Sequence, residues 1–144
     1  MGRYLVAAGL VTGAVLAGAP VAQAGPQHHG TNPATTGCAN GSTAIASRPV
    51  TDAYGAHVTD VEVRYSASCG TNWIRLYNPV PGTTAYKSIR AQGGDWLPVE
   101  ADGGTVWSYS MQVYAPGSTC IEFSVMIQGP GYQADTGPYS IVIC

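Results

Sequence analysis

The residues with the clearest chemistry in this sequence are its four cysteines, which all follow residue 24: Cys38, Cys69, Cys120 and Cys144. An even number of cysteines in an oxidising compartment predicts disulfide bonds. Zinc ligation would need closely spaced pairs such as C-x-x-C, which the sequence does not contain. Four cysteines allow three pairings, and we favour the one that joins neighbours in sequence, Cys38 with Cys69 and Cys120 with Cys144. We expect no metal site and no cofactor.

Histidines and carboxylates are the next candidates for chemistry. Asp60 and Ser66 lie near His57 in sequence, but no G-x-S-x-G nucleophile turn accompanies them. His28 lies close to the expected mature N-terminus, where Pro26 lacks the backbone N–H that a terminal Cu(II) site needs. The sequence does not fix the separation of any pair among the other carboxylates considered for glycoside hydrolysis, which are Glu62, Asp95, Glu100, Asp102 and Glu122. We therefore expect no catalytic residues and no enzymatic activity.

Aromatic residues offer binding chemistry instead. The chain has nine tyrosines and three tryptophans but one phenylalanine. Tyrosine and tryptophan combine an apolar ring with a polar tip, which suits half-exposed binding faces. Trp73, Tyr77 and Trp96 fall on the less apolar sides of predicted strands or in loops, so a flat row of these rings would stack on sugars. The alternative is that the rings pack against the ends of the core.

Period-two alternation of apolar and polar residues predicts the strands that position these side chains. The predicted strands cover residues 42–50, 60–66, 72–78, 83–91, 105–114, 119–128 and 139–144, with a short extended piece at 96–99. Turns rich in glycine and proline separate them, including a long loop at Gly129–Pro138. The sequence therefore predicts an all-β fold: a small antiparallel β-sandwich or barrel of seven or eight short strands with two disulfides.

Strand parity adds detail to this prediction. Cys120 and Cys144 each lie opposite the apolar face of their strand, so antiparallel neighbours would bring them together. Residues 105–114 alternate most cleanly, with Trp107 and Tyr109 on one face and Ser108 on the other. In 83–91, Ala85, Lys87 and Ile89 share a face, and the pattern does not decide whether this face lies toward the core.

The first 24 residues have the pattern of a secretory signal peptide. Arg3 precedes an uncharged apolar run from Tyr4 to Pro20, and Ala22-Gln23-Ala24 predicts cleavage after Ala24. The apolar run is shorter than the roughly 20 residues of a spanning helix, which argues against membrane anchoring. We expect a secreted, extracellular protein with a flexible tail at residues 25–37 and a single disulfide-stapled β domain at 38–144.

The charge of the mature part limits its partners. Five basic and eight acidic residues follow residue 24, which gives a net charge of −3. This balance argues against nucleic acid and against an anionic membrane surface as partners. We expect a monomer whose ligand is an extracellular or cell-surface glycan or protein.

Two segments resemble a known family. Residues 36–47 (TGCANGSTAIAS) and 61–75 (VEVRYSASCGTNWIR) resemble the YjfA-like secreted family of unknown function, over about Thr36 to Gly82. The shared features are a T-G-C start, R-Y-S before the second cysteine and C-G-T-N-W after it; Ile74 departs from the small residue expected there. The resemblance implies pairing of Cys38 with Cys69, and it implies no activity, catalytic residue or substrate.

These observations predict a non-enzymatic extracellular binding or interaction module. One alternative is a carbohydrate-binding module that uses Trp73, Tyr77 and Trp96. Another is a secreted inhibitor of a protease or other enzyme, in which the Gly129–Pro138 loop is held near the Cys120–Cys144 bridge as a stiff presenting segment.

Overall fold

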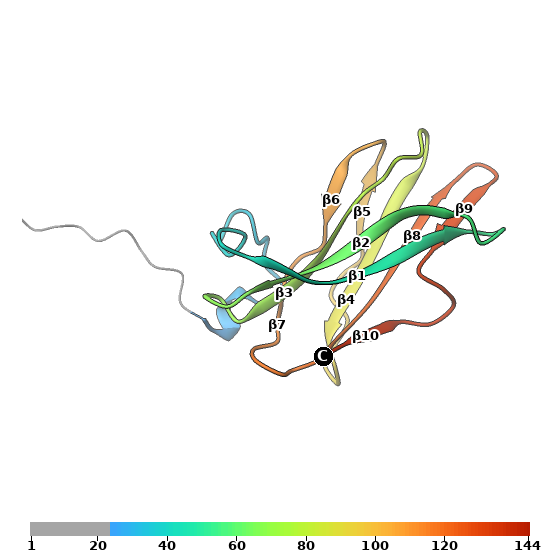
Figure 1. The fold of residues 1–144 in the computed structure, drawn as a ribbon. Helices are drawn as coiled ribbons and strands as arrows, with labels where there is room; N and C mark the ends of the chain where they lie inside the picture. The colour runs from blue at the N-terminus through green and yellow to red at the C-terminus, as the bar shows by residue number, and fades with distance from the viewer. Residues whose placement is uncertain (1–23) are drawn as a thin grey trace, which may run out of the picture.

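The computed structural model describes residues 24–144, and these form an all-β protein (Figure 1). The described part has one short 3-10 helix and ten strands: η1 (Pro26–His28), β1 (Thr43–Asp52), β2 (His57–Ser66), β3 (Thr71–Tyr77), β4 (Thr84–Ala91), β5 (Glu100–Gly103), β6 (Trp107–Tyr109), β7 (Val113–Tyr114), β8 (Ile121–Gly129), β9 (Tyr132–Asp135) and β10 (Ile141–Ile143). The predicted signal peptide falls almost wholly on residues 1–23, outside the described residues. Within the described part, no helix has the length and hydropathy needed to cross a bilayer.

All strand pairings are antiparallel, in the order β5-β4-β8-β9-β1-β2-β3-β6, with β10 beside β8 and β7 beside β3. The sheet curls until β5 and β6 approach each other, which nearly closes an eight-stranded barrel. In Figure 1, β1 and β2 cross in front of β4 and β8, as expected for the two walls of a barrel. The predicted all-β antiparallel fold is confirmed, and the structure decides for a barrel over a sandwich.

The barrel interior holds the apolar core. Alternate residues of each long strand point inward, and each becomes fully buried where the opposite wall covers it. The main contributors are Val61 and Val63 of β2, Ile74 and Leu76 of β3, Ile89 of β4, and Phe123 and Ile127 of β8. Burying each of the larger side chains contributes about 1.5–3 kcal/mol, an upper figure because denatured chains already bury some surface.

Lys87 also points into this interior. The residue is 1% exposed, and its Nζ donates to Asp102 Oδ2 on β5 at 2.6 Å and to Ser108 Oγ on β6 at 3.2 Å. A third contact runs to the Ala85 carbonyl at 3.4 Å. A buried ammonium is stable only with such partners. Lys87 therefore links β5 and β6 from inside, across the seam where these two strands do not pair.

This network explains why β6 faces the opposite way from an ordinary amphipathic strand. Ser108 and Ser110 are buried and Trp107 and Tyr109 point outward, although the apolar face of an alternating strand usually faces the core. Ser108 supplies an acceptor to Lys87, and Ser110 Oγ accepts the Ile74 N–H at 3.1 Å. The polar face of the strand is inward because the interior already contains a charge.

The segment at residues 25–37 is packed against the barrel. The prediction of a flexible tail at these residues is therefore wrong. The Gly30 N–H donates to the Gln112 carbonyl at 2.8 Å. The fully buried Gln112 side chain donates through Nε2 to the hydroxyls of Thr31 and Thr36, both at 2.9 Å, and its Oε1 accepts from Thr71. Low apolar content suggested mobility, but backbone and hydroxyl hydrogen bonds hold this segment instead.

Both predicted disulfides are confirmed. Cys38 bonds Cys69 across 31 residues, and Cys120 bonds Cys144 across 24. Pairing of Ile121 with Ile143 brings the second pair into register, as strand parity predicted.

Gly70, which follows Cys69 in the β2–β3 turn, has a φ of +65°, and a Cβ there would lie 3.1 Å from the Tyr114 ring. Both the positive φ and the close packing require glycine at this position.

Two further predictions about loops were wrong. The Gly129–Pro138 loop contains β9, which pairs with β8 and with β1, so only residues 136–140 remain as a loop before β10. The extended piece at 96–99 forms no strand, and the short strand lies instead at Glu100–Gly103. β9 pairs with the preceding strand β8 and with the distant β1, and β5 pairs with the preceding strand β4, so strand pairing overrode the local turn residues.

Candidate functional site

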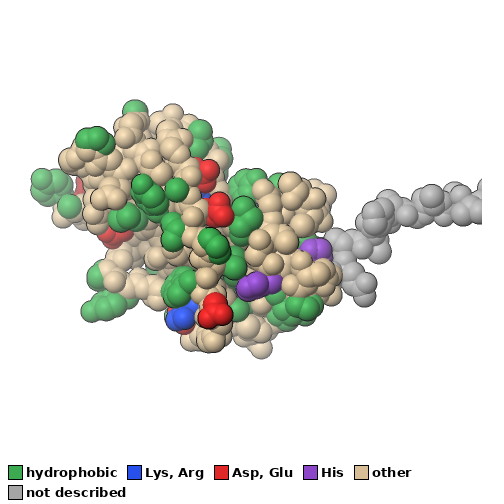
Figure 2. Space-filling view, turned by 180° about the vertical axis from the view of Figure 1, so that it is seen from behind, with side chains coloured by type: hydrophobic (Ala, Val, Ile, Leu, Met, Phe, Trp, Pro, Cys, Tyr) green, Lys and Arg blue, Asp and Glu red, His purple; other side chains and the backbone are tan. Residues whose placement is uncertain are grey.

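Three outward aromatic rings lie together on neighbouring strands β3 and β6, and we call Tyr77, Trp107 and Tyr109 the aromatic strip. Tyr77 is opposite Trp107 in the ladder, and Arg75 is opposite Tyr109. Trp107 is 62% exposed and Tyr77 39%. Figure 2 shows that, on the face drawn there, hydrophobic side chains gather in small groups rather than one continuous patch. The aromatic strip is a group of this kind, in which three large, partly exposed rings lie on a single pair of strands.

The rings of the strip are tilted relative to each other. The Tyr77 and Trp107 centroids are 5.7 Å apart with an interplanar angle of 50°. The Arg75 Cζ lies 5.2 Å from the Trp107 centroid, a cation–π contact that steadies the indole. Tyr77 and Trp107 therefore do not form a flat platform, and Arg75 packs against the indole ring.

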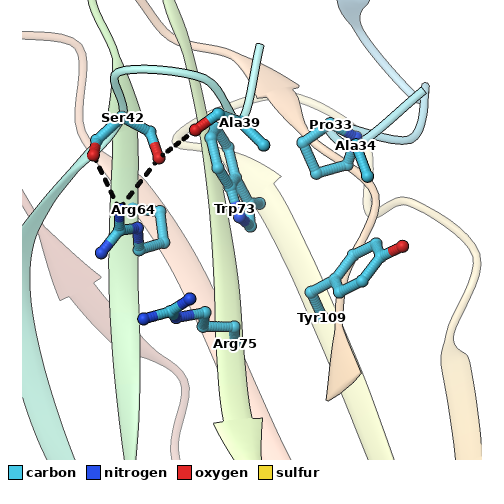
Figure 3. A pocket seen from close by; sticks show the side chains of 8 residues that line it. All are labelled: Pro33, Ala34, Ala39, Ser42, Arg64, Trp73, Arg75 and Tyr109. Carbon is cyan, nitrogen blue, oxygen red and sulfur yellow. Dashed lines mark hydrogen bonds between the residues drawn. The ribbon is translucent and has the colours of Figure 1, made fainter. Parts of the chain in front are cut away.

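A pocket of about 200 Å³ lies at one end of the strip, and we call it the arginine pocket (Figure 3). Arg64, Trp73, Arg75 and Tyr109 line it from the barrel, and the loop at residues 33–42 covers it. Trp73 is 3% exposed, so its ring packs under the pocket rather than on the open surface. In Figure 3 the two arginines lie on one side of Trp73, and Tyr109 lies on the other.

The two arginines are held by protein contacts. Arg64 donates through one terminal nitrogen to the carbonyl of Ser42 at 2.7 Å and to its hydroxyl at 3.0 Å. Arg75 Nε donates to Glu62 Oε2 at 2.8 Å, and Arg64 lies 3.6 Å from the same oxygen. The ion pairs of Arg64 and Arg75 with Glu62 therefore lie beside the pocket that both arginines line.

The covering loop is held just before its start and at its middle. The Cys38–Cys69 bond ties it to the β2–β3 turn. Near its start, Asn32 accepts the Ala34 N–H at 2.8 Å and donates to the Tyr109 hydroxyl at 3.4 Å. The disulfide and these hydrogen bonds keep the loop over Trp73.

A second hollow of about 360 Å³ lies on the other side of Tyr109, at the seam between β5 and β6. Glu100, Asp102, Trp107 and Tyr109 are among the residues that line it. Asp102 is paired with Lys87, as described above. Tyr109 therefore lies between an arginine-lined pocket and an acidic hollow.

Trp96 is not part of the strip. It follows β4, where the Arg90 Cζ lies 4.7 Å from its ring centroid, and Arg90 pairs with Glu122 on β8. Together with Tyr86 and Tyr139 it borders a hollow of about 610 Å³ over β4 and β8. The three predicted binding residues thus divide between two places: Trp73 and Tyr77 lie along β3, and Trp96 lies around the barrel from them.

The other candidates from the sequence do not form a reactive site among the described residues. His57 lies 3.2 Å from Asp60, and both are exposed, but Ser66 is at the opposite end of the same ten-residue strand. His28 lies near Cys38 and Cys69, whose sulfurs are bonded to each other and hold no thiolate for a metal. Burial, and then the Asp52 carboxylate, raise the pKa of Tyr132, which lies on β9 away from the strip.

The fold and this surface define a class of protein: a small, nearly closed, disulfide-stapled β-barrel with exposed aromatic rings on one pair of neighbouring strands. The comparison with family models is more specific. Residues 27–128 match the family described as protein of unknown function (DUF2690), and the chain belongs to that family. The match identifies a family of unknown function, as expected, but does not link it to YjfA. No curated protein and no solved structure matches the chain.

The matched range contains the whole strip, the arginine pocket and residues 27–37, whereas part of the hollow beside Trp96 lies beyond it. Sequence reasoning missed Trp107 and Tyr109 as exposed residues because alternation shows which side chains share a face but not which face points outward. The available signal was Lys87: if Ala85 and Ile89 face the core, Lys87 does too, and its neighbours must then be polar.

Proposed function

We propose that this protein is a secreted, non-enzymatic carbohydrate-binding module whose ligand lies along the aromatic strip. The observation that carries the proposal is Trp107, a large ring with most of its surface exposed beside Tyr77 and Tyr109. Exposed apolar rings grouped on rigid strands are characteristic of ligand contacts. Sugar rings present C–H faces that stack on such rings, and their hydroxyl groups pair with polar neighbours.

The strip is also preorganised for binding. Its rings lie on paired strands rather than on loops, and Arg75 holds the indole of Trp107 in place. A preorganised surface loses little side-chain entropy when a ligand is bound. Tilted rings suit a glycan chain that twists along its axis better than they suit a flat crystalline surface.

Secretion is the second part of the proposal. Residues 1–24 have the signal-peptide pattern, and both disulfides are compatible with an oxidising exterior. An exported binding module would meet glycans at the cell surface or in the medium.

Retention on immobilised polysaccharides tests the binding. We expect the purified protein to be retained on at least one of cellulose, chitin, xylan and polygalacturonate. Trp107→Ala should lower the affinity by about tenfold or more, since a central tryptophan commonly dominates such contacts. The ring is largely exposed, so its removal should leave the barrel folded.

Tyr54→Ala is the matched control. Tyr54 is 96% exposed in the turn between β1 and β2, and it lies outside the strip. This variant should bind like the wild type. The proposal is wrong if no polysaccharide retains the protein, or if Trp107→Ala and Tyr54→Ala reduce retention equally.

A further inference from the structure

We propose that the arginine pocket binds a carboxylate carried by a sugar residue, so that the preferred ligand of the strip is a glycan containing uronic acid. This inference rests on the proposed function and adds the charge of the ligand. It follows from the charge, the free donors and the position of the pocket.

The charge of the pocket is unbalanced. Arg64 and Arg75 share one carboxylate, that of Glu62, through contacts of 3.6 Å and 2.8 Å to the same oxygen. Two guanidinium groups against one carboxylate leave one positive charge. A ligand with one negative charge per sugar matches this excess, whereas a neutral sugar leaves it uncompensated.

Donors remain available for such a ligand. Arg75 uses Nε for Glu62, and its two terminal nitrogens have no protein hydrogen-bond partner among residues 24–144. Arg64 is held by Ser42 with its side chain 18% exposed, so its position is fixed before a ligand arrives. The planar guanidinium fork matches a carboxylate with two parallel hydrogen bonds.

The position of the pocket connects it to the strip. Tyr109 belongs to both the strip and the pocket wall, and Arg75 contacts Trp107 as well as Glu62. A sugar stacked on the strip would therefore place its neighbour beside the arginines. The acidic hollow on the other side of Tyr109 disfavours an anion there, which restricts the carboxylate to the arginine end.

Trigalacturonic acid and its fully methyl-esterified form are the paired probes, because they share ring and length and differ in charge. Calorimetric titration should show the acid binding about tenfold more tightly than the ester at low ionic strength. The preference should shrink in high salt, because the contact is charged and partly exposed.

Arg75→Gln is the diagnostic variant, and the ratio of the two affinities is the readout. Loss of the carboxylate contact should bring the ratio close to one, whereas a disturbed Trp107 ring would weaken acid and ester together. Arg48→Gln is the control, since Arg48 is exposed on β1 and its only side-chain hydrogen bond in the described part is to the Ser47 carbonyl. It should keep the wild-type ratio.

The outcomes separate the two proposals. Equal binding of acid and ester overturns the carboxylate site but leaves a carbohydrate-binding strip in place, provided that Trp107→Ala weakens the binding of both. Tighter binding of a sulfated trisaccharide that carries no carboxylate than of trigalacturonic acid overturns the carboxylate assignment. Absence of binding to either probe and to every polysaccharide overturns both proposals.

Discussion

At the scale of single residues, Lys87 has the most unusual environment in the barrel. It is the only lysine in the chain, and its ammonium is enclosed between strands β4, β5 and β6. Its partner Asp102 is different, because 45% of that side chain is exposed. The two members of this ion pair therefore differ in their access to water, and the loss of each should have a different cost.

Asp102→Asn should destabilise the protein by about 3 kcal/mol, because it leaves a buried ammonium without its counter-charge. Lys87→Met should cost less, about 1–2 kcal/mol, because Asp102 can be hydrated and the main loss is the hydrogen bond of Ser108. Urea unfolding at neutral pH measures both variants. A larger loss in Lys87→Met than in Asp102→Asn would contradict this account of the ion pair.

At the scale of elements, the two disulfides have similar loop lengths but different neighbours. Cys38–Cys69 holds the loop that covers the arginine pocket. Cys120–Cys144 instead joins the residue before the start of β8 to the residue after the end of β10. Loop length governs the entropic effect on the unfolded chain, and position governs the effect on the site.

Replacing either cysteine pair with serine should therefore cost about 3.5 kcal/mol in the chain-entropy model. Only the Cys38→Ser, Cys69→Ser variant should also lose the preference for trigalacturonic acid over its ester, because its covering loop is released. Urea unfolding and the paired titrations measure the two effects. Loss of the preference in the Cys120→Ser, Cys144→Ser variant would refute this division of roles.

At the scale of the whole molecule, the seam between β5 and β6 is where the barrel is incomplete. Lys87 spans the seam from inside, and Asn78 forms hydrogen bonds at one end of the seam. The buried Asn78 side chain donates to Thr83 Oγ1 at 2.9 Å and to the Gly104 carbonyl at 3.1 Å, while its backbone N–H donates to the Val106 carbonyl. These bonds tie the end of β3 to the connection between β5 and β6.

Asn78→Ala should cost about 2–3 kcal/mol, because it leaves buried groups unpaired. It should also speed hydrogen exchange of the Gly104 amide, which bonds the Thr83 carbonyl beside it. Asn40→Ala is the control, since Asn40 is exposed in a loop, and its effect should stay within about 0.5 kcal/mol. Unchanged exchange at Gly104 in Asn78→Ala would mean that the seam is closed by other contacts.

Local patterns were sufficient for much of this fold. Alternation located β2, β3, β4 and β8 to within a few residues, and parity predicted the pairing of Cys120 with Cys144. The outward positions of Trp73 and Tyr77 on β3 also followed from alternation, because Ile74 and Leu76 had to face the core. These features depend on residues close together in sequence, whose side-chain directions the strand period determines.

Tertiary structure decided the rest. Whether Trp107 or Ser108 faces inward depends on Lys87, which lies on a different strand, and the order of residues 25–37 depends on Gln112. The pairing of β2 with β3 and of β3 with β6 also brought Arg64, Arg75 and Tyr109 together around one pocket. A period of two specifies which residues share a face, but only the surface that covers a strand determines which face is buried.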